Sequence, residues 1–313
     1  MKAVFSQISS GFFLLATLCA SEKEEMYDFR PYQVGREWDF RVILQPEVLF
    51  LRPYEGLLEC AIEHEKEIAT MKQTQFVPSF RISLGFQTDY DGNDLLFSYM
   101  RYHNCRKEDL SSNGLVESIV WFLDDPTFVS FLQTSWQIKL DLLDIYMRKQ
   151  ISIGSSFRLG LRFGMRGGIL DQTIKIKRTV NTLQEESSNT SDQWFLGPKW
   201  GLDGTFLLSR HFYFAYEAAY HLLYGKYVLD HREQGTFEKK RHLDVEGIKS
   251  ASELAAGFGY AFLFSEEFHA DFSCKVYYLA FPAENQCVRL LVPGAGAGDL
   301  SFLGVGICAR FDF

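Results

Sequence analysis

The chain of 313 residues has no uninterrupted apolar run near the roughly 20 residues that a membrane-spanning helix needs, although 47% of its residues are hydrophobic. It also lacks an excess of positive charge: 40 acidic residues outnumber 32 basic ones, and the net charge is -8. A protein that binds nucleic acid needs a concentrated basic face to neutralise phosphates. The composition therefore excludes membrane-spanning helices and predicts no nucleic-acid partner.

Motifs for catalysis, metals and cofactors are missing as well. No two of the six cysteines form a C-x-x-C pair, and the GAGAG segment at 294–298 precedes no helix pattern, so it predicts a loop rather than a phosphate cradle. Adjacent residues of an extended chain face opposite ways, so Asp230 and His231 cannot pair unless the expected loop turns there. Glu217 and His221 share a face but stand about 13 Å apart along an extended strand. We therefore expect no enzyme activity, no catalytic residue, no metal and no cofactor.

What the sequence has in abundance is period-two alternation, the pattern of β-strands with two unlike faces. In residues 157–166, large apolar side chains alternate with glycines and with Arg158, Arg162 and Arg166. The final stretch, GVGICARFDF at 304–313, alternates in the same way. Glycine and charge on one face suit a crowded lumen, and apolar residues on the other suit lipid. The pattern predicts an all-β fold, a transmembrane antiparallel β-barrel over residues 21–313.

The alternation gives about ten strands, joined in turn by short and longer links. The short links are TDYDGN, RKQ, SR and SEE, and the longer ones include NTLQEESSNTSD and DHREQGTFEKKRHLDVEGI. Outer-membrane barrels have short periplasmic turns and long external loops. This rhythm predicts five long loops outside the cell and both termini on the periplasmic side. The expected strands cover residues 37–51, 77–87, 94–103, 134–147, 151–180, 194–208, 211–228, 249–264, 268–280 and 300–313.

Two irregularities leave the count open. The apolar face flips between Leu142 and Leu143, which predicts a β-bulge. The segment 151–180 is longer than a membrane requires, and GLVESIVWFL, which follows the third strand, could hold a helix or an extra strand pair. Twelve strands are therefore the alternative.

The first 20 residues are typical of a cleaved secretory signal peptide. Lys2 precedes an apolar stretch over 11–18, and small residues follow at 19–21. Export leads to an oxidising compartment. The five cysteines that remain are an odd number, so at least one stays unpaired or bridges to another chain.

The expected lumen-facing residues carry both signs of charge. An arginine ladder opposite carboxylates could select solutes in a channel; the same residues could instead pair and fill a narrow barrel, because about eight strands leave no pore. The predicted lining residues are Arg158, Arg162, Arg166, Arg81, Lys139, Asp141, Lys199, Asp203, Glu217, Glu253, Asp271 and Arg310, and Arg41, Glu47, Lys275 and Asp312 are expected on the same face.

Several blocks, in order, resemble the major outer membrane protein-like family of Legionella and chlamydial type. They are LFLRPYEGLLECAIEHE, FVPSFRISLGF, DGNDLLFSYMRYHN, WQIKLDLLDIYMRKQISIGSSFRLGLRFGMRGGILDQ and GPKWGLDGTFLLSRHFYFAYEAAYHLLYGKY. The resemblance implies an outer-membrane barrel with a porin-like or envelope-structural role. It also implies that Phe313 acts as the carboxyl-terminal signal read by the barrel assembly machinery. Chlamydial members are longer and richer in cysteine than this chain.

The resemblance makes porin-like passage of small hydrophilic solutes the leading expectation. The alternative is a closed structural or surface-interaction barrel, linked to envelope proteins or to a second copy by disulfides from Cys60, Cys105 or Cys287. The expected partners are outer-membrane lipid and the assembly machinery.

Overall fold

The protein is described by a computed structural model with almost every described residue in a β-strand. The described residues are 40–56, 59–63, 67–70, 75–88, 93–118, 127–180, 183–209, 211–235, 238–263, 268–285 and 298–313. Among them, no helix has the length and apolar character to cross a membrane. The expected signal peptide at 1–20 lies outside the described residues.

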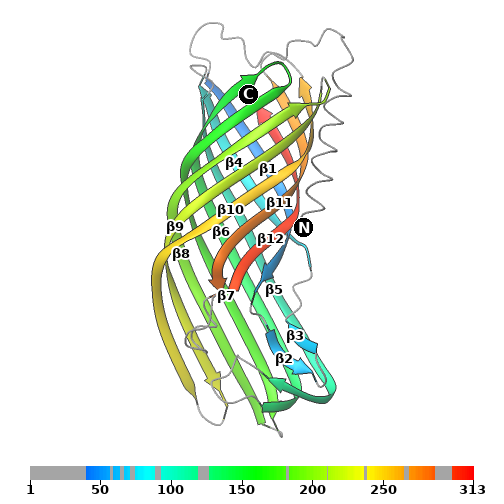
Figure 1. The fold of residues 1–313 in the computed structure, drawn as a ribbon, viewed down its shortest axis with the longest axis vertical. Coiled ribbons are helices and arrows are strands. Elements are labelled where there is room, and N and C mark those ends of the chain that lie inside the picture. The colour runs from blue at the N-terminus through cyan, green and yellow to red at the C-terminus, as the bar shows by residue number, and fades with distance from the viewer. Residues whose placement is uncertain are drawn as a thin grey trace, which may run out of the picture.

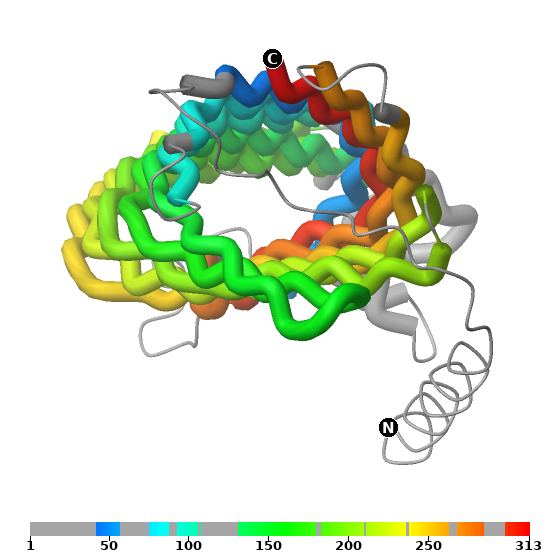
Figure 2. The backbone as a smooth tube through the Cα atoms, turned by 90° about the horizontal axis from the view of Figure 1, so that it is seen from above, coloured from blue at the N-terminus to red at the C-terminus, as the bar shows by residue number. Residues whose placement is uncertain are grey.

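Ten antiparallel strands close into a ring (Figures 1 and 2). In order round the ring they are β1 (Phe40–Glu55), β4 (Val77–Thr88), β5 (Asn93–Ser118), β6 (Thr127–Ile153), β7 (Phe157–Val180), β8 (Leu183–Leu207), β9 (Phe212–Gln234), β10 (Lys239–Leu263), β11 (His269–Asn285) and β12 (Gly298–Asp312). β1 pairs with β12 and closes the ring. The predicted barrel and its count of about ten strands are confirmed. The described chain reaches twelve strands only with a short hairpin, β2 (Glu59–Glu63) and β3 (Glu67–Thr70), which pairs with β5 outside the ring.

The strands are unequal in length, so the barrel is taller on one side. β5 to β10 have 23 to 27 residues each, whereas β1, β4, β11 and β12 have 12 to 17. The extra length projects as a curved sheet beyond the end opposite the short turns, toward the bottom of Figure 1. We call this part the extension; among the described residues it comprises 102–118, 127–141, 170–180, 183–193, 225–235 and 238–250.

The extension corrects the prediction of long loops. The expected loop NTLQEESSNTSD is mostly strand, because β7 continues to Val180 and β8 begins at Leu183. The expected loop after residue 228 is likewise the end of β9 and the start of β10. Polar residues were read as loops, but on β8 they alternate between a buried inner face with Ser187 and Asn189 and an outer face in water.

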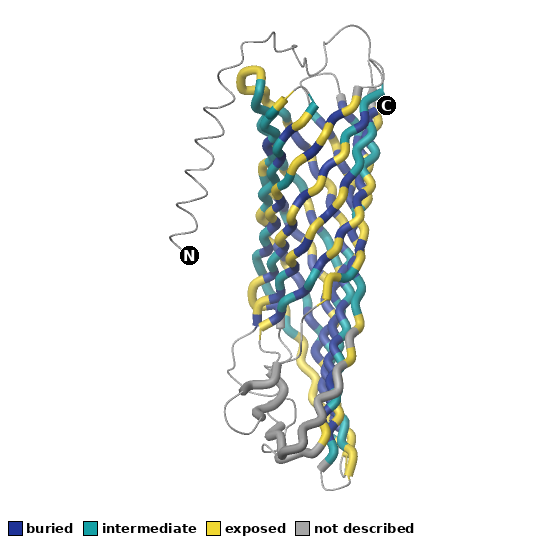
Figure 3. The backbone as a smooth tube through the Cα atoms, turned by 90° about the vertical axis from the view of Figure 1, so that its right-hand side faces the viewer, coloured by how far each residue is buried: buried dark blue, intermediate teal, exposed yellow. Residues whose placement is uncertain are grey.

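The outer face carries an apolar belt around the part of the barrel next to the short turns; positions on its extension side are called above the belt, although they lie below it in Figures 1 and 3. On β7 the belt runs from Leu159 to Ile169, ten steps or about 33 Å along the strand, which a tilt near 40° reduces to about 25 Å of height. That height matches the lipid-facing band of outer-membrane barrels. Its most exposed side chains include Phe163, Met165, Ile169, Leu143, Ile145, Met147, Trp194, Leu196, Leu202, Leu254, Phe258, Val305 and Ile307.

Above the belt the two faces exchange their character. On β6, Leu143 and Ile145 point outward within the belt, while Leu140 and Leu142 above them point inward and are buried. The pairing of β6 with β7 runs from Phe131 to Ile153 without a register shift. The predicted β-bulge at Leu142 is therefore wrong. Buried and exposed residues alternate along the strands (Figure 3), and the flip marks the level at which the strand leaves lipid and becomes polar outside and apolar inside, as in a soluble sheet.

Candidate functional site: the barrel interior

At the level of the belt, the interior is filled by a charge network. Alternation turns every second residue inward, and these inward positions carry arginine, lysine and carboxylates. The network comprises Glu47, Arg81, Asp94, Asp144, Arg148, Arg162, Arg166, Lys199, Asp203, Glu217, Glu253 and Lys275.

One chain of ion pairs crosses the whole lumen. Arg81 on β4 donates to Glu253 on β10 over 2.7 Å, although these strands are four places apart in the ring. Glu253 accepts a second hydrogen bond of 2.7 Å from Arg166 on β7. The side chains of Arg81, Glu253 and Arg166 are only 14%, 10% and 1% exposed. Opposite walls are thus joined directly, with little access for water between them.

Arg166 is the centre of this chain. Its guanidinium makes two hydrogen bonds of 2.6 Å to the carboxylate of Asp144 and lies 3.1 Å from a ring nitrogen of His221. Lys199 donates to the same Asp144 carboxylate over 2.7 Å. Bidentate and charge-assisted bonds of this kind hold a planar guanidinium in one orientation.

A second group of pairs continues the network toward the short turns. Arg162 donates to Asp203 over 2.6 Å and to Glu217 over 2.9 Å, and Glu217 also accepts from Lys275. Gly160 beside Arg162 has no room for a Cβ, because the Asp203 carboxylate lies 2.5 Å from where it would stand. This crowding explains why glycines and arginines share a face of β7.

The network is balanced in charge. Arg81, Arg166 and Lys199 face Glu47, Asp144 and Glu253, while Arg148, Arg162 and Lys275 face Asp94, Asp203 and Glu217. Six cations therefore meet six carboxylates, mixed rather than separated on opposite walls. Buried charges need such pairing, because an unpaired charge in a low-dielectric interior is costly.

Above the network lies an apolar layer. Rings from distant strands meet there: Tyr102 on β5 packs against Phe302 on β12 at 5.0 Å, and Phe195 on β8 against Phe281 on β11 at 6.0 Å. Each pair joins strands three places apart, so the side chains fill the centre. The layer comprises Met100, Tyr102, Trp136, Ile138, Leu140, Leu170, Ile174, Phe195, Tyr227, Phe281 and Phe302, all at most 4% exposed.

Most predicted lining residues face the interior. Arg81, Arg162, Arg166, Lys199, Asp203, Glu217 and Glu253 belong to the charge network; Asp271 accepts from Tyr213, Arg310 pairs with Asp312, and Arg158 stands on the same face of β7.

Two predicted lining residues lie on the opposite face. Lys139 and Asp141 point outward: Asp141 accepts from the hydroxyl of Tyr99 over 2.6 Å and contacts His103 at 3.2 Å on the outer surface. The prediction took them for lumen residues because it placed a bulge at Leu142. With continuous register, the inward positions of β6 are instead Asp144 and, further down, Arg148.

Asp144, Arg148 and Asp94 are the network members that sequence reasoning missed. Arg148 donates to Asp94 on β5, and both side chains are buried. The signal was present: counting in steps of two from Leu142 leads to Asp144 and Arg148 on the inner face.

The candidate catalytic pairs do not form. His231 points inward and contacts Asn189 and Glu233, while its neighbour Asp230 points outward and contacts His242 at 2.7 Å. Burial lowers the pKa of His231, and the hydrogen bond to Asp230 raises the pKa of His242. The described residues hold no group of histidine, cysteine and acidic side chains arranged to bind a metal.

Of the candidate disulfide cysteines, Cys60 and Cys287 lie outside the residues whose side chains are described. Cys105 is a free thiol exposed on the outer face of the extension. Phe313 is exposed beside the apolar belt, and its ring packs at a tilt against that of Phe268, with 5.4 Å between the centroids.

Comparison with known proteins gives one family and several barrels. The family model described as "Legionella pneumophila major outer membrane protein precursor" matches residues 33–284. No curated protein sequence matches the chain. Similar solved structures include the outer membrane protease OmpT of Escherichia coli (8% identity, TM-score 0.47, covering 90% of this chain and 99% of that one). They also include a FadL homologue of Pseudomonas aeruginosa (7%, 0.32, 88% and 90%) and the outer membrane channel DcaP of Acinetobacter baumannii (10%, 0.18, 90% and 99%). At these TM-scores the structural likenesses carry no functional argument.

Proposed function

The chain belongs to the family of the Legionella pneumophila major outer membrane protein, and on that premise we propose that it is a closed outer-membrane barrel. In this proposal the barrel contributes to the structure of the outer membrane and displays the extension at the surface. The observation that carries it is the Arg81–Glu253–Arg166 chain, which bonds opposite walls through the middle of the lumen.

The dimensions and accessibility of the interior support closure. Barrels of about eight strands are filled by side chains, whereas 16 to 18 strands leave an aqueous channel; ten strands stand near the filled end. A water-filled pore would expose its lining. Here Arg166, Lys199 and His221 are 4% exposed or less, and the apolar layer lies directly above them.

Porin-like passage, the leading expectation from the sequence, stays a prediction and is the second candidate. Membership in a family of outer membrane proteins is compatible with it. For a solute to pass, however, the guanidiniums of Arg162 and Arg166 would have to leave carboxylates to which they are bonded at 2.6 Å. The apolar layer would have to open as well.

Conductance in a planar lipid bilayer tests the two candidates. Closure predicts no discrete steps from the refolded wild type. The double variant Arg81→Ala, Tyr102→Ala shortens one side chain in each filled layer and should conduct, which shows that the assay can register an open lumen. Wild-type steps whose ion selectivity shifts in Arg162→Glu would refute closure and establish passage along the arginine ladder.

Placement and partners form the second part of the proposal. The short turns and both termini face the periplasm, and the extension faces outward, as in other outer-membrane barrels. Phe313 is the residue through which the assembly machinery recognises the chain. Cys105 is the described cysteine placed to bridge to an envelope protein or a second copy. Non-reducing electrophoresis of intact cells tests the bridge: a species lost on reduction and in Cys105→Ser supports it, and a wild type that runs only as monomer contradicts it.

A further inference from the structure

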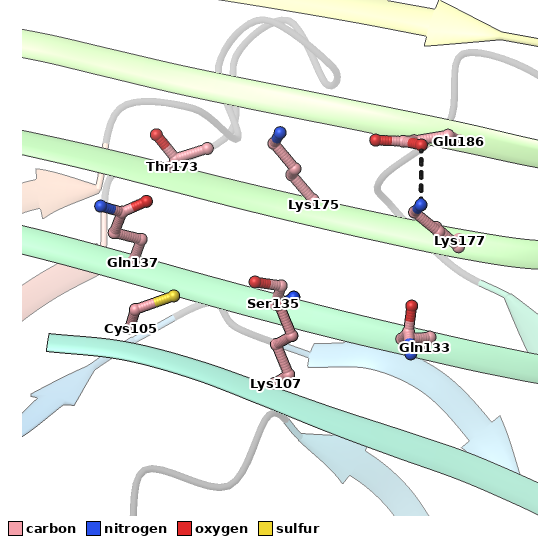
Figure 4. A pocket seen from close by; sticks show the side chains of 9 residues that line it. All are labelled: Cys105, Lys107, Gln133, Ser135, Gln137, Thr173, Lys175, Lys177 and Glu186. Carbon is pink, nitrogen blue, oxygen red and sulfur yellow. Dashed lines mark ion pairs between the residues drawn. The ribbon is translucent and has the colours of Figure 1, made fainter.

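A groove lies on the outer surface of the extension, separate from the barrel interior. It encloses about 250 Å³ between β5, β6, β7 and β8. Its lining includes Lys107, Ser135, Gln137, Thr173 and Lys175 (Figure 4). Because these residues stand on the face of the strands that carries the apolar belt lower down, the groove opens toward the surroundings of the barrel.

Two lysines flank a small side chain in this groove. Lys107 is paired with Ser135, and Ser135 with Lys175, so the three stand in one row across adjacent strands. Neighbouring strands are about 4.8 Å apart, which puts the two lysine backbones roughly 10 Å apart with only a hydroxyl between them. Within the described residues neither lysine forms an ion pair. The row therefore offers two ammonium groups around a space of the size of a phosphate.

The lining of the groove is positive. It carries Lys107, Lys175 and Lys177 against one carboxylate, Glu186, which is paired with Lys177 at 3.2 Å. Outside the lining, Asp109 stands on β5 in the row of Lys177, and Asp171 and Asp192 stand with Lys139 two outward rows nearer the belt than the other two lysines. Within the lining, the charges of Lys107 and Lys175 therefore remain uncompensated.

The height of the groove indicates its ligand. Ile169 is the last apolar outward residue of β7, and Thr173 and Lys175 follow four and six residues later, about 10 and 15 Å above the belt for a strand tilted near 40°. The polar zone of a phospholipid bilayer is only about 5 to 8 Å deep on each side. The lysines therefore stand above the phosphates of ordinary phospholipids, at the level of a headgroup enlarged by sugars.

We propose that this groove binds the phosphate-bearing sugar headgroup of a glycolipid in the leaflet on the side of the extension. Lys107 and Lys175 hold the phosphate as point charges, and basic pockets beside a membrane are a recognised way to bind anionic headgroups. Ser135, Gln137 and Thr173 supply neutral donors and acceptors for sugar hydroxyls. The site does not depend on whether the barrel is closed.

Titration of the refolded full-length protein with lipids, followed by native mass spectrometry, tests the site. The probes are a lipid A carrying a phosphorylated sugar core, the same lipid with the core phosphates removed, phosphatidylglycerol and inorganic phosphate. The variant Lys107→Gln, Lys175→Gln removes both groove charges. The matched control Lys226→Gln, Lys240→Gln removes two lysines on β9 and β10, on the other side of the extension. Heat-dependent gel migration checks that all the variants are folded.

We expect the phosphorylated glycolipid to bind the wild type and the control equally, and the groove variant about 30-fold more weakly, from roughly fivefold for each lysine. The dephosphorylated form should bind at least tenfold more weakly than the phosphorylated one. Equal binding by the groove variant would overturn the site. Equal binding of phosphatidylglycerol, or binding of inorganic phosphate without glycolipid, would overturn the assignment to a sugar-bearing headgroup.

Discussion

Replacing Arg166 by methionine should destabilise the folded barrel by about 3–5 kcal/mol, the cost of leaving a buried charge without its partner. The side chain of Arg166 is 1% exposed and makes three hydrogen bonds of 2.6 to 2.7 Å to Asp144 and Glu253. Methionine fills a similar length but leaves the balanced network one cation short. Lys199 and Arg81 still contact the two carboxylates, which keeps the loss within this range.

The assay is equilibrium unfolding in denaturant from lipid vesicles, followed by tryptophan fluorescence. A second variant separates charge balance from packing. Arg166→Met combined with Glu253→Leu removes one charge of each sign, and replacing a buried pair by apolar residues is often neutral or better. The double variant should therefore be more stable than Arg166→Met alone, a coupling that a double-mutant cycle measures.

The control is Arg232→Met on the outer face of the extension. Arg232 pairs with Glu238 at 2.7 Å, but its side chain is 53% exposed, so solvent screens the pair and no measurable loss is expected. A loss below about 1 kcal/mol for Arg166→Met, with no recovery in the double variant, would refute the reasoning. It would mean that water enters the lumen and screens the network, contrary to a closed barrel.

Three further predictions test packing, pH dependence and the position of the belt. Gly257→Ala should cost about 1–3 kcal/mol through overpacking, because its Cβ would collide with the carbonyl oxygen of Cys274, whereas Gly247→Ala, with open space around it, should be tolerated in the same unfolding assay. Above the belt, burial and then the nearby Glu284 raise the pKa of Glu55 from 4.5 to about 8. Since the folded state holds that proton more tightly than the unfolded chain, stability should fall as the pH rises from about 4.5 to about 8. Glu55→Gln should reduce this slope and leave the part due to Glu284, whose pKa is also raised by burial; an unchanged slope would contradict the assignment. In single-cysteine variants in vesicles, a charged maleimide should label Cys105, exposed on the extension, but label Cys274, exposed within the belt, only after unfolding; rapid labelling of Cys274 in vesicles would place the belt elsewhere.

The part of the fold in lipid was predictable from the sequence, because lipid imposes a strict alternation. Residues 157–166 illustrate this: apolar side chains must face outward, so Arg158, Arg162 and Arg166 had to face the lumen. The ring of ten strands follows from counting such segments, since every strand edge in a membrane must be paired. What the alternation could not predict was which inward charges touch, because that depends on side chains from strands four places apart.

The extension was missed because the apolar residues change from the outer face to the inner face where the strands leave lipid. Outward polar residues such as Lys175 and Lys177, and inward ones such as Asn189, look like loop residues when lipid is assumed outside. At Leu142 the apolar residues change face although the register is continuous. In the sequence alone this change looks the same as a β-bulge. Both parts of a strand alternate, so alternation alone does not separate them. A strand in the membrane has its apolar residues on the outer face, and its continuation in water has them on the inner face.

The change of apolar residues from the outer to the inner face affects both the lumen and the outer surface at the same level of the barrel. Above the belt the inward positions of β6 become apolar, at Leu142 and Leu140, so the interior there needs apolar partners, and the rings of Tyr102 and Phe302 supply them. At the same level the outward positions become polar, at Asp141 and Lys139, and the polar surface on which the lysine groove lies begins there. An apolar interior above a paired-charge interior gives two successive barriers of opposite character. An ion that could exchange for a partner in the charge network would still meet an apolar layer, and an apolar solute would be stopped by the charges, which is the strongest physical argument against passage through the resting barrel.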